Sequence, residues 1–264
     1  APLVLTYHTK YDVDIAKAVR GKLLQESAIR ALVQNIASCD EVWVVSRGAG
    51  ENLRSLGYEG GYIVMENGVD VPRGRVSDEA IAAATGRYDL PQNVPVFLFV
   101  GRLMWYKGIR IILDALKTLC EKNVDFRMVF VGEGADGAEI RSYAEERKLS
   151  DRCFFTGAIS DREIIRAWYG RSDLFLFPST FDTNGLVVRE AAASGTATVM
   201  IRNSCASEGV GDGRNGFCIE ENAAAMAAKL EDLCRAPETM RTVGKNAQRE
   251  LYVSWETAVQ RAMA

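Results

Sequence analysis

A cationic loop is the first segment in which residue type and spacing suggest chemistry. Arg102 and Lys107 stand five residues apart, between the apolar run Val96–Val100 and the helical pattern Ile109–Cys120. A guanidinium and an ammonium on a loop that leads into a helix suit a pyrophosphate, because the free N–H groups of a helix start also attract anions. By itself, however, the segment is more simply explained as a solvated basic loop.

Two carboxylates frame a second segment. Asp182 follows the apolar run Leu174–Phe177, and Glu190 lies eight residues further along, on a helix that Gly185 opens. Eight helical residues span about 12 Å, which would let one carboxylate bind a sugar and the other a ribose, with phosphates between them. Asn184 and Gly185 allow a tight turn that leaves free N–H groups as an anion site. Spacing alone also fits a helix-start charge plus a surface residue.

Two further motifs match known binding patterns but have simpler explanations. The segment Gly132–Gly137 matches the G-x-G-x-x-G of dinucleotide sites, yet it does not lie in the first strand–helix unit, and the next strand carries no acid for a ribose. Asp12 and Asp14 spell the D-x-D of some metal-dependent enzymes, at the start of a helical pattern where acids complement the helix dipole. We expect neither a dinucleotide cofactor nor a metal.

A single histidine and a turn complete the candidates. His8 follows the apolar run Leu3–Tyr7, and a lone histidine is usually structural, although the carboxyl end of a strand keeps a functional role open. The segment Glu66–Asp70 is a turn signal and, taken alone, only a loop. One histidine argues against a histidine-based metal site. The six cysteines form no C-x-x-C pair, which fits small buried side chains in a reducing cytoplasm.

The elements that must position these residues are short apolar runs that alternate with amphipathic stretches. This alternation predicts parallel sheets covered on both faces, a doubly wound α/β fold. In such folds ligands bind at the carboxyl ends of the strands, where the candidate segments fall. Ser160 and Glu163 form a capping-box pattern ahead of the helix Ile164–Trp168. Predicted helices include Ile109–Cys120 and Asp136–Lys148; the predicted strands are Leu3–Tyr7, Glu41–Val45, Tyr62–Met65, Val96–Val100, Phe126–Val131, Cys153–Thr156, Leu174–Phe177 and Thr198–Ile201.

Composition excludes several classes of function. A formal net charge of −3 and a pI near 5.5 leave no broad basic surface, so nucleic acid is not an expected partner. No apolar run approaches the roughly 20 residues that span a bilayer, and no secretory signal is evident, which favours the cytoplasm. The first strand begins within two residues of Ala1, so we expect a piece of a longer chain, with a linker in Gly68–Ala84.

Taken together, these motifs resemble glycosyltransferase family 4, the retaining glycosyltransferases with the GT-B fold. The resemblance implies metal-independent transfer of a hexose from a nucleotide diphosphate sugar, with a UDP-sugar favoured, to an acceptor hydroxyl and without a cofactor. Its motifs occur in the family's order: Asn67–Asp70, Gly101-Arg102 with Lys107-Gly108, Val131–Gly134, Phe155–Gly157, Ser172-Asp173 before Phe177–Ser179, and Asp182 with Glu190.

The resemblance implies a role for each charged candidate. Arg102 and Lys107 would hold the diphosphate and stabilise the charge of the leaving group. Asp182 would contact hydroxyls of the donor sugar and Glu190 those of the ribose. His8 would lie across the cleft, near the sugar.

Backbone groups would complete the donor site. The loop residue Gly101 would contribute to donor binding, and the N–H groups of Asn184, Gly185 and Leu186 would assist Asp182. The nucleobase would lie beside Gly157, Ala158 and Ile159. This sequence has Asp182 where the family usually has Glu, and Asn184 where it usually has Phe, which puts the identity of the sugar in doubt.

The resemblance also predicts three parts of the chain and the partners. Residues 1–68 would be the last part of an incomplete N-terminal, acceptor-side domain; residues 69–250 the Rossmann-like nucleotide-sugar-binding domain; and residues 251–264 a helix crossing back toward the N-terminal domain. The acceptor could be a glycan, a lipid or a small molecule, and a lipid would place the protein peripherally at the inner membrane face. Two alternatives are a non-catalytic nucleotide-sugar-binding module or inactive fragment, and a GT-B epimerase, for which one histidine is a poor supply of acid and base.

Overall fold

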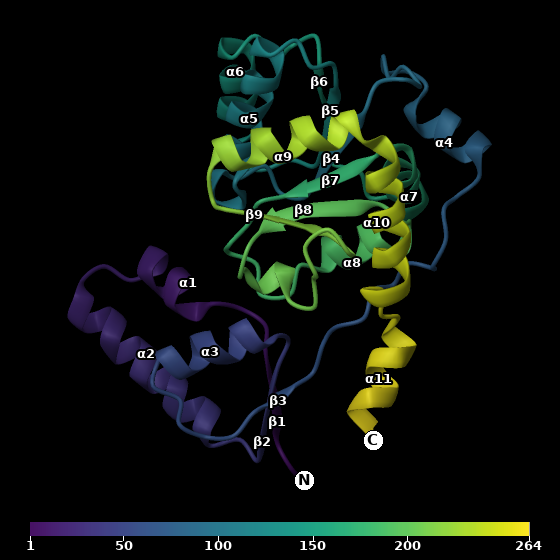
Figure 1. Cartoon of the computed structure of the whole chain (residues 1–264). Helices are drawn as coiled ribbons and strands as arrows, with labels where there is room; N and C mark the ends of the chain where they lie inside the picture. The colour runs from purple at the N-terminus through teal and green to yellow at the C-terminus, as the bar shows by residue number, and fades with distance from the viewer. Residues whose placement is uncertain (264) are drawn as a thin grey trace.

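In the computed structural model, which describes residues 1–263, the strands form two sheets (Figure 1). Neighbouring strands in both sheets run parallel, and helices connect them, so the predicted doubly wound α/β class is confirmed. The smaller sheet has the order β1-β2-β3, with β1 Val4–Tyr7, β2 Glu41–Val44 and β3 Ile63–Val64. The larger has the order β6-β5-β4-β7-β8-β9, with β4 Val96–Val100, β5 Arg127–Val131, β6 Cys153–Gly157, β7 Leu174–Phe177, β8 Ala197–Ile201 and β9 Phe217–Ile219.

The predicted strands agree with the observed ones to within one residue at each end. Only β9 (Phe217–Ile219) has no predicted counterpart. Its three buried residues are too few to show a hydrophobic period, and its pairing with β8 is what makes it a strand.

The helices cover both faces of the larger sheet. On one face α5 packs against α9, and on the other α8 packs against α7 and α10. The apolar face of α5 is buried from Ile109 to Leu119, as the sequence period predicts. The helices are α1 Tyr11–Ala18, α2 Lys22–Ala37, α3 Arg47–Ser55, α4 Asp78–Thr85, α5 Ile109–Glu121, α6 Gly137–Glu146, α7 Arg162–Arg171, α8 Leu186–Ala193, α9 Ala223–Arg235, α10 Pro237–Glu250 and α11 Trp255–Met263, with short 3-10 turns η1 Trp105–Lys107 and η2 Cys205–Ser207.

The predicted capping box at Ser160 is wrong. The N-cap of α7 is Asp161, whose carboxylate accepts hydrogen bonds from the backbone N–H groups of Glu163 at 2.8 Å and Ile164 at 3.3 Å. Both Ser and Asp are good N-caps, but a carboxylate also interacts favourably with the helix dipole. The helix therefore begins at Arg162, two residues earlier than the sequence pattern suggested.

The larger sheet carries the main hydrophobic core. Every residue of β4 and β7 is buried, and the fully buried Phe97 ring stacks on Phe126 with centroids 5.9 Å apart. Each large side chain buried this way contributes about 1.5–3 kcal/mol, so this sheet forms a stable frame for its strand ends. A second, smaller cluster around Tyr7, Val44 and Leu53 forms the core between the smaller sheet and its helices.

The last helix returns to the segment that follows β3 (Figure 1). The backbone N–H of Val69 donates to Val253 at 2.9 Å, and Arg261 on α11 lies 3.4 Å from the carboxylate of Glu66. A Cβ at Gly68 would lie 2.4 Å from the backbone N of Trp255, so only glycine allows this close approach. The division into residues 1–68, 69–250 and 251–264 stays a prediction, and residue 264 lies outside the described residues.

Within the described residues, none of the helices has the length and apolar character needed to cross a bilayer.

Candidate active site

A cavity of about 230 Å³ lies where strand ends of the two sheets meet. It is at the carboxyl end of β1 and at the loops after β4 and β7, the edge at which ligands of parallel sheets bind. The cavity brings together seven residues that the sequence nominated, His8, Gly101, Lys107, Asp182, Asn184, Gly185 and Leu186, with Asn67, Val100, Phe177, Thr183 and Val187.

A glycine lets the two main loops of the site approach each other. Gly108 follows η1 in a left-handed conformation (φ 77°), and a Cβ there would lie 2.2 Å from the carbonyl oxygen of Pro178. Any side chain would push the loop after β4 away from the loop after β7. This contact carries Lys107, at the end of η1, toward Asp182.

Lys107 and Asp182 form an ion pair in the cavity. The Nζ of Lys107 lies 2.5 Å from Oδ1 of Asp182, and their side chains are only 11% and 23% exposed. The hydroxyl of Ser179 donates to the other carboxylate oxygen at 2.5 Å. The resemblance implied that these two charges would bind different groups of one donor. In the structure each is the other's partner, and both charges face the same cavity.

The start of α8 forms another wall of the cavity. Gly185 is its N-cap in a left-handed conformation (φ 61°), and no side chain of the described residues caps this helix. The N–H of Val188 already donates to the carbonyl of Gly185 at 2.8 Å, whereas those of Leu186 and Val187 precede the first helical hydrogen bond, and together with the helix dipole they attract an anion. A cation and a helix start in one cavity are what a diphosphate requires.

Glu190 lies further along α8, outside the cavity lining. The hydroxyl of the fully buried Tyr169 donates to its carboxylate at 3.3 Å. Burial raises the pKa of the Glu190 carboxyl above its ordinary value of 4.5, against the opposing effects of the Tyr169 hydrogen bond and the charge of Arg162. Burial, and then the nearby Glu190, raise the pKa of the Tyr169 hydroxyl well above 10.

Arg102 also lies outside the cavity lining. Its side chain is exposed, with the guanidinium carbon 5.9 Å from the centre of the Tyr106 ring. The same ring packs against Phe181 and lies 5.6 Å from the ammonium of Lys107. Arg102 is therefore held beside Lys107 through Tyr106, without lining the cavity itself.

The predicted nucleobase loop follows β6, away from this lining. Gly157 has φ 79°, and its carbonyl accepts a hydrogen bond from the N–H of Gly132 at 2.9 Å. A Cβ on Gly157 would lie 3.3 Å from the carboxylate of Glu133. Gly157 therefore lies next to the loop after β5, while Ala158 is exposed and Ile159 half-buried.

Three residues to which the sequence assigned no role at the site, Asn67, Lys10 and Thr183, join the smaller sheet to the cavity and its loops. Asn67 lines the cavity with its amide 3.5 Å from Nδ1 of His8. The hydroxyl of Thr183 donates to the carbonyl of His8 at 2.6 Å, and Lys10 donates to the carbonyl of Thr180 at 2.8 Å. The turn at Asn67 was a visible signal. Lys10 and Thr183 gave none, because their partners are far away in the chain.

The two rejected motifs have structural roles. A Cβ at Gly132 would lie 2.0 Å from the carbonyl oxygen of Gly101, and one at Gly134 would lie 2.3 Å from that of Leu103. These glycines therefore let the loops after β4 and β5 pack together. Asp12 and Asp14 lie in the first turn of α1, as expected for acids at a helix start, and Asp12 accepts a hydrogen bond from Asn52 at 3.2 Å.

Comparison with known proteins agrees with this arrangement. The family model described as glycosyl transferases group 1 matches residues 83–250, the segment that contains the larger sheet and both loops of the cavity.

Several named relatives cover nearly the whole chain. The D-inositol 3-phosphate glycosyltransferase of Streptomyces avermitilis is 30% identical over 97% of this chain and 58% of its own length. The GDP-mannose-dependent alpha-(1-6)-phosphatidylinositol dimannoside mannosyltransferase of Mycobacterium tuberculosis is 26% identical over 99% of this chain and 66% of its own length. The chain thus spans about three fifths of these relatives.

Solved structures share the fold. The sucrose-phosphate synthase of Thermosynechococcus elongatus is 26% identical, with a TM-score of 0.81 over 98% of this chain and 66% of its own. HepE of Anabaena, solved in complex with UDP and glucose, is 21% identical and has a TM-score of 0.83 over 99% of this chain and 70% of its own. At that identity the likeness to HepE shows the fold alone.

Proposed function

Because this chain belongs to the group 1 glycosyltransferases, we propose that the protein transfers a hexose from a nucleotide diphosphate sugar to an acceptor hydroxyl, with retention of configuration and without a metal. The observation that carries this proposal is the cavity in which Lys107, Asp182 and the uncapped start of α8 meet. A cation and free helix N–H groups bind linked phosphates, and a carboxylate beside them can bind sugar hydroxyls.

Charge stabilisation of the leaving group is the proposed source of catalysis. Lys107 donates to the diphosphate, and negative charge grows on it as the bond to the sugar breaks. Arg102 reaches the same phosphates from beside Tyr106. The two cations perform the role that a metal ion has in D-x-D enzymes. The acceptor hydroxyl attacks on the face from which the diphosphate leaves, so Asp182 binds the sugar and is not assigned as a nucleophile.

The remaining contacts orient the donor. His8 lines the cavity from the carboxyl end of β1 and contacts the sugar. Glu190, already hydrogen-bonded to Tyr169, accepts from the ribose hydroxyls. Backbone groups of Gly157, Ala158 and Ile159 contact the nucleobase. Gly101, Asn184, Gly185 and Leu186 contribute backbone groups to the donor.

The donor is proposed to be a UDP-sugar. HepE, whose fold this chain shares, was solved with UDP and with UDP-glucose, whereas the M. tuberculosis relative is named for GDP-mannose. The acceptor is a glycan, a lipid or a small molecule with a free hydroxyl. A lipid acceptor would bring the protein from the cytoplasm to the inner membrane face.

Binding and turnover can be measured separately. Calorimetric titration of UDP, GDP and ADP identifies the base, and release of the nucleoside diphosphate from the matching nucleotide sugars measures hydrolysis or transfer. Tight binding of one nucleotide with turnover of its sugars supports the transferase. Binding without any turnover supports the alternative, a non-catalytic nucleotide-sugar-binding module. No binding of any of the three would contradict both.

A further inference from the structure

Backbone N–H groups at the start of α3 are hydrogen-bonded by a residue that is distant in the sequence. A helix start leaves the N–H groups of its first three residues without partners inside the helix. In α3 the hydroxyl of Ser46 accepts from Ala49 at 3.0 Å. The N–H groups of Arg47 and Gly48 donate to the carboxylate of Glu208 at 2.8 Å and 2.5 Å, across 161 and 160 positions of sequence. Glu208 therefore satisfies the donors that Ser46 leaves open.

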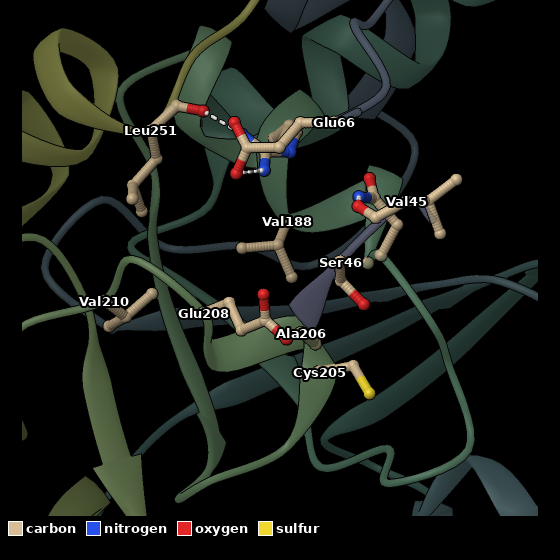
Figure 2. A pocket seen from close by; sticks show the side chains of 12 residues that line it. Val45, Ser46, Glu66, Val188, Cys205, Ala206, Glu208, Val210 and Leu251 are labelled. Carbon is tan, nitrogen blue, oxygen red and sulfur yellow. Dashed lines mark hydrogen bonds and ion pairs between the residues drawn. The ribbon is translucent and has the colours of Figure 1, made fainter. Parts of the chain in front are cut away.

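The turn η2, which precedes Glu208, touches α3 on one side and α8 on the other. A Cβ at Gly48 would lie 2.6 Å from the sulfur of Cys205, so α3 and η2 are in close contact. A Cβ at Gly185 would lie 2.9 Å from the Cβ of Ala206, so η2 also lies against the N-cap of α8. Figure 2 shows Cys205, Ala206 and Glu208 beside Ser46 in this region.

Two more contacts cross the seam, the interface at which α3 and the segment after β3 meet η2 and α8. The side-chain amide of Asn184 donates to the carbonyl of Val45 at 2.5 Å, directly before Ser46. Arg189 on α8 pairs with Glu66, which is labelled in Figure 2, at 3.0 Å. Asn184 and Gly185 line both this seam and the 230 Å³ cavity, so a movement at the seam reaches the cavity wall.

We propose that Glu208 is a positioning residue. Its two hydrogen bonds to the start of α3, here termed the latch, join α3 to η2 and so hold the smaller sheet, with His8 and Asn67, against the start of α8. A carboxylate at a helix start gains from charge-assisted hydrogen bonds and from the helix dipole. When the latch opens, water can bind the carboxylate and the two N–H groups instead, so the contact is reversible. That the latched cavity is a donor site rests on the proposed function, but the latch itself does not.

The latch has a kinetic consequence. The groups proposed to bind the nucleotide follow strands of the larger sheet, whereas His8 and Asn67 follow β1 and β3 of the smaller sheet. When this contact opens, His8 and Asn67 move away from the cavity, while the groups proposed to bind the nucleotide stay in place. Loss of Glu208 therefore lowers turnover of the nucleotide sugar while the nucleoside diphosphate still binds.

Amide hydrogen exchange tests the latch directly. In Glu208→Ala, exchange at Arg47 and Gly48 should accelerate about tenfold or more, since a hydrogen bond to a charged group contributes about 1.5–3 kcal/mol. Glu208→Gln keeps the side-chain volume and one acceptor oxygen, and should give a smaller acceleration. The control is Glu51→Gln, an exposed carboxylate in the same helix, which should leave both amides unchanged. Unchanged exchange in a folded Glu208→Ala protein would overturn the latch.

Kinetics test the positioning role. Glu208→Ala should lower kcat for the nucleotide sugar at least tenfold and leave the Kd of the nucleoside diphosphate within about twofold, with partial rescue in Glu208→Asp. Faster exchange with unchanged kcat would refute the positioning role. If the wild-type protein turns over no donor, the proposed function fails, while the exchange experiment still decides the latch.

Discussion

The starts of α3 and α8 face the same seam but satisfy their N–H groups differently. In α3, Ser46 and Glu208 accept from the first helical residues. In α8, Gly185 is the N-cap and, within residues 1–263, no side chain caps the helix. η2 touches both helix starts. A helix start is therefore open to an anionic ligand only where the protein does not supply its own anion.

A second difference concerns the nearest carboxylates. Glu208 binds the backbone of α3, whereas Asp182, close to the start of α8, pairs with the side chain of Lys107. A phosphate can compete for a lysine that is 11% exposed and opens onto a cavity. Glu208 therefore stabilises the packing of α3 against η2, whereas a phosphate can displace Asp182 from Lys107.

The largest expected effect comes from removing the cation beside α8. Lys107→Ala should lower kcat for the nucleotide sugar about 10²–10³-fold, the usual loss for one donor to transition-state charge. Steady-state rates of nucleoside diphosphate release measure it. Lys117→Ala, on the α5 surface, is the matched control and should be near wild type. Equal rates in both variants would show that Lys107 does not stabilise the leaving group, and would contradict the proposal that a ligand binds at the start of α8 but not at that of α3.

A smaller effect should follow from relieving Lys107 of its internal partner. Asp182→Asn should tighten binding of the nucleoside diphosphate about three- to tenfold, because the ligand no longer competes with a carboxylate at close range. The same variant should turn over less nucleotide sugar. Calorimetry measures the affinity, and Asp232→Asn, an exposed acid on α9, provides the control. Weaker nucleotide binding in Asp182→Asn would show that the pair is not a displaceable one.

The contact between η2 and α8 can be tested through stability. Gly185→Ala places a methyl group 2.9 Å from Ala206 and in a left-handed backbone, which should cost about 1–3 kcal/mol in the free energy of unfolding. That corresponds to a Tm lower by several degrees, at about 2–4 °C per kcal/mol. Gly213→Ala has a similar φ of 75° but nothing within 4 Å. A Tm loss of the same size in both variants would mean that backbone strain alone matters and that η2 does not bear on α8.

The smallest effect concerns the pH dependence of Glu190, a half-buried carboxyl on α8. Burial raises its pKa in the folded state, so the folded protein binds more protons than the unfolded one between the two pKa values. Stability contributed by this group is therefore lost as the pH rises through that window, above about 4.5. Glu190→Gln should melt at a higher temperature than wild type at pH 8, with the difference shrinking toward pH 4. A Tm difference that does not change with pH would contradict this sign.

Local sequence signals predicted most of the fold. The apolar face of α5 and the buried residues of β4 and β7 follow from periods of a few residues, because burial of one side acts within a single element. The capping of α7 was wrong by one residue, since Ser160 and Asp161 are both good caps and only the geometry of the turn chooses between them. β9 was missed because its three residues become a strand through pairing with β8.

The candidate site divides in the same way. Lys107, Asp182 and Gly185 could be nominated because each lies where a strand pattern ends, and parallel strands end at one edge. Their mutual pairing could not, since the Lys107–Asp182 ion pair joins residues 75 positions apart. The places of Glu190 and Arg102 outside the cavity lining also depend on how a helix rotates and a loop folds.

Hydrophobic period and turn chemistry act over a few neighbouring positions, so the element order, the parallel α/β class and the residues at the strand ends follow from the sequence. Long-range packing selects which helix start receives a carboxylate from the protein and which stays open to the cavity. Glu208 reaches Arg47 and Gly48 because the packing of two sheets brings them together. No local pattern encodes such a contact, since its energy exists only after the chain has folded.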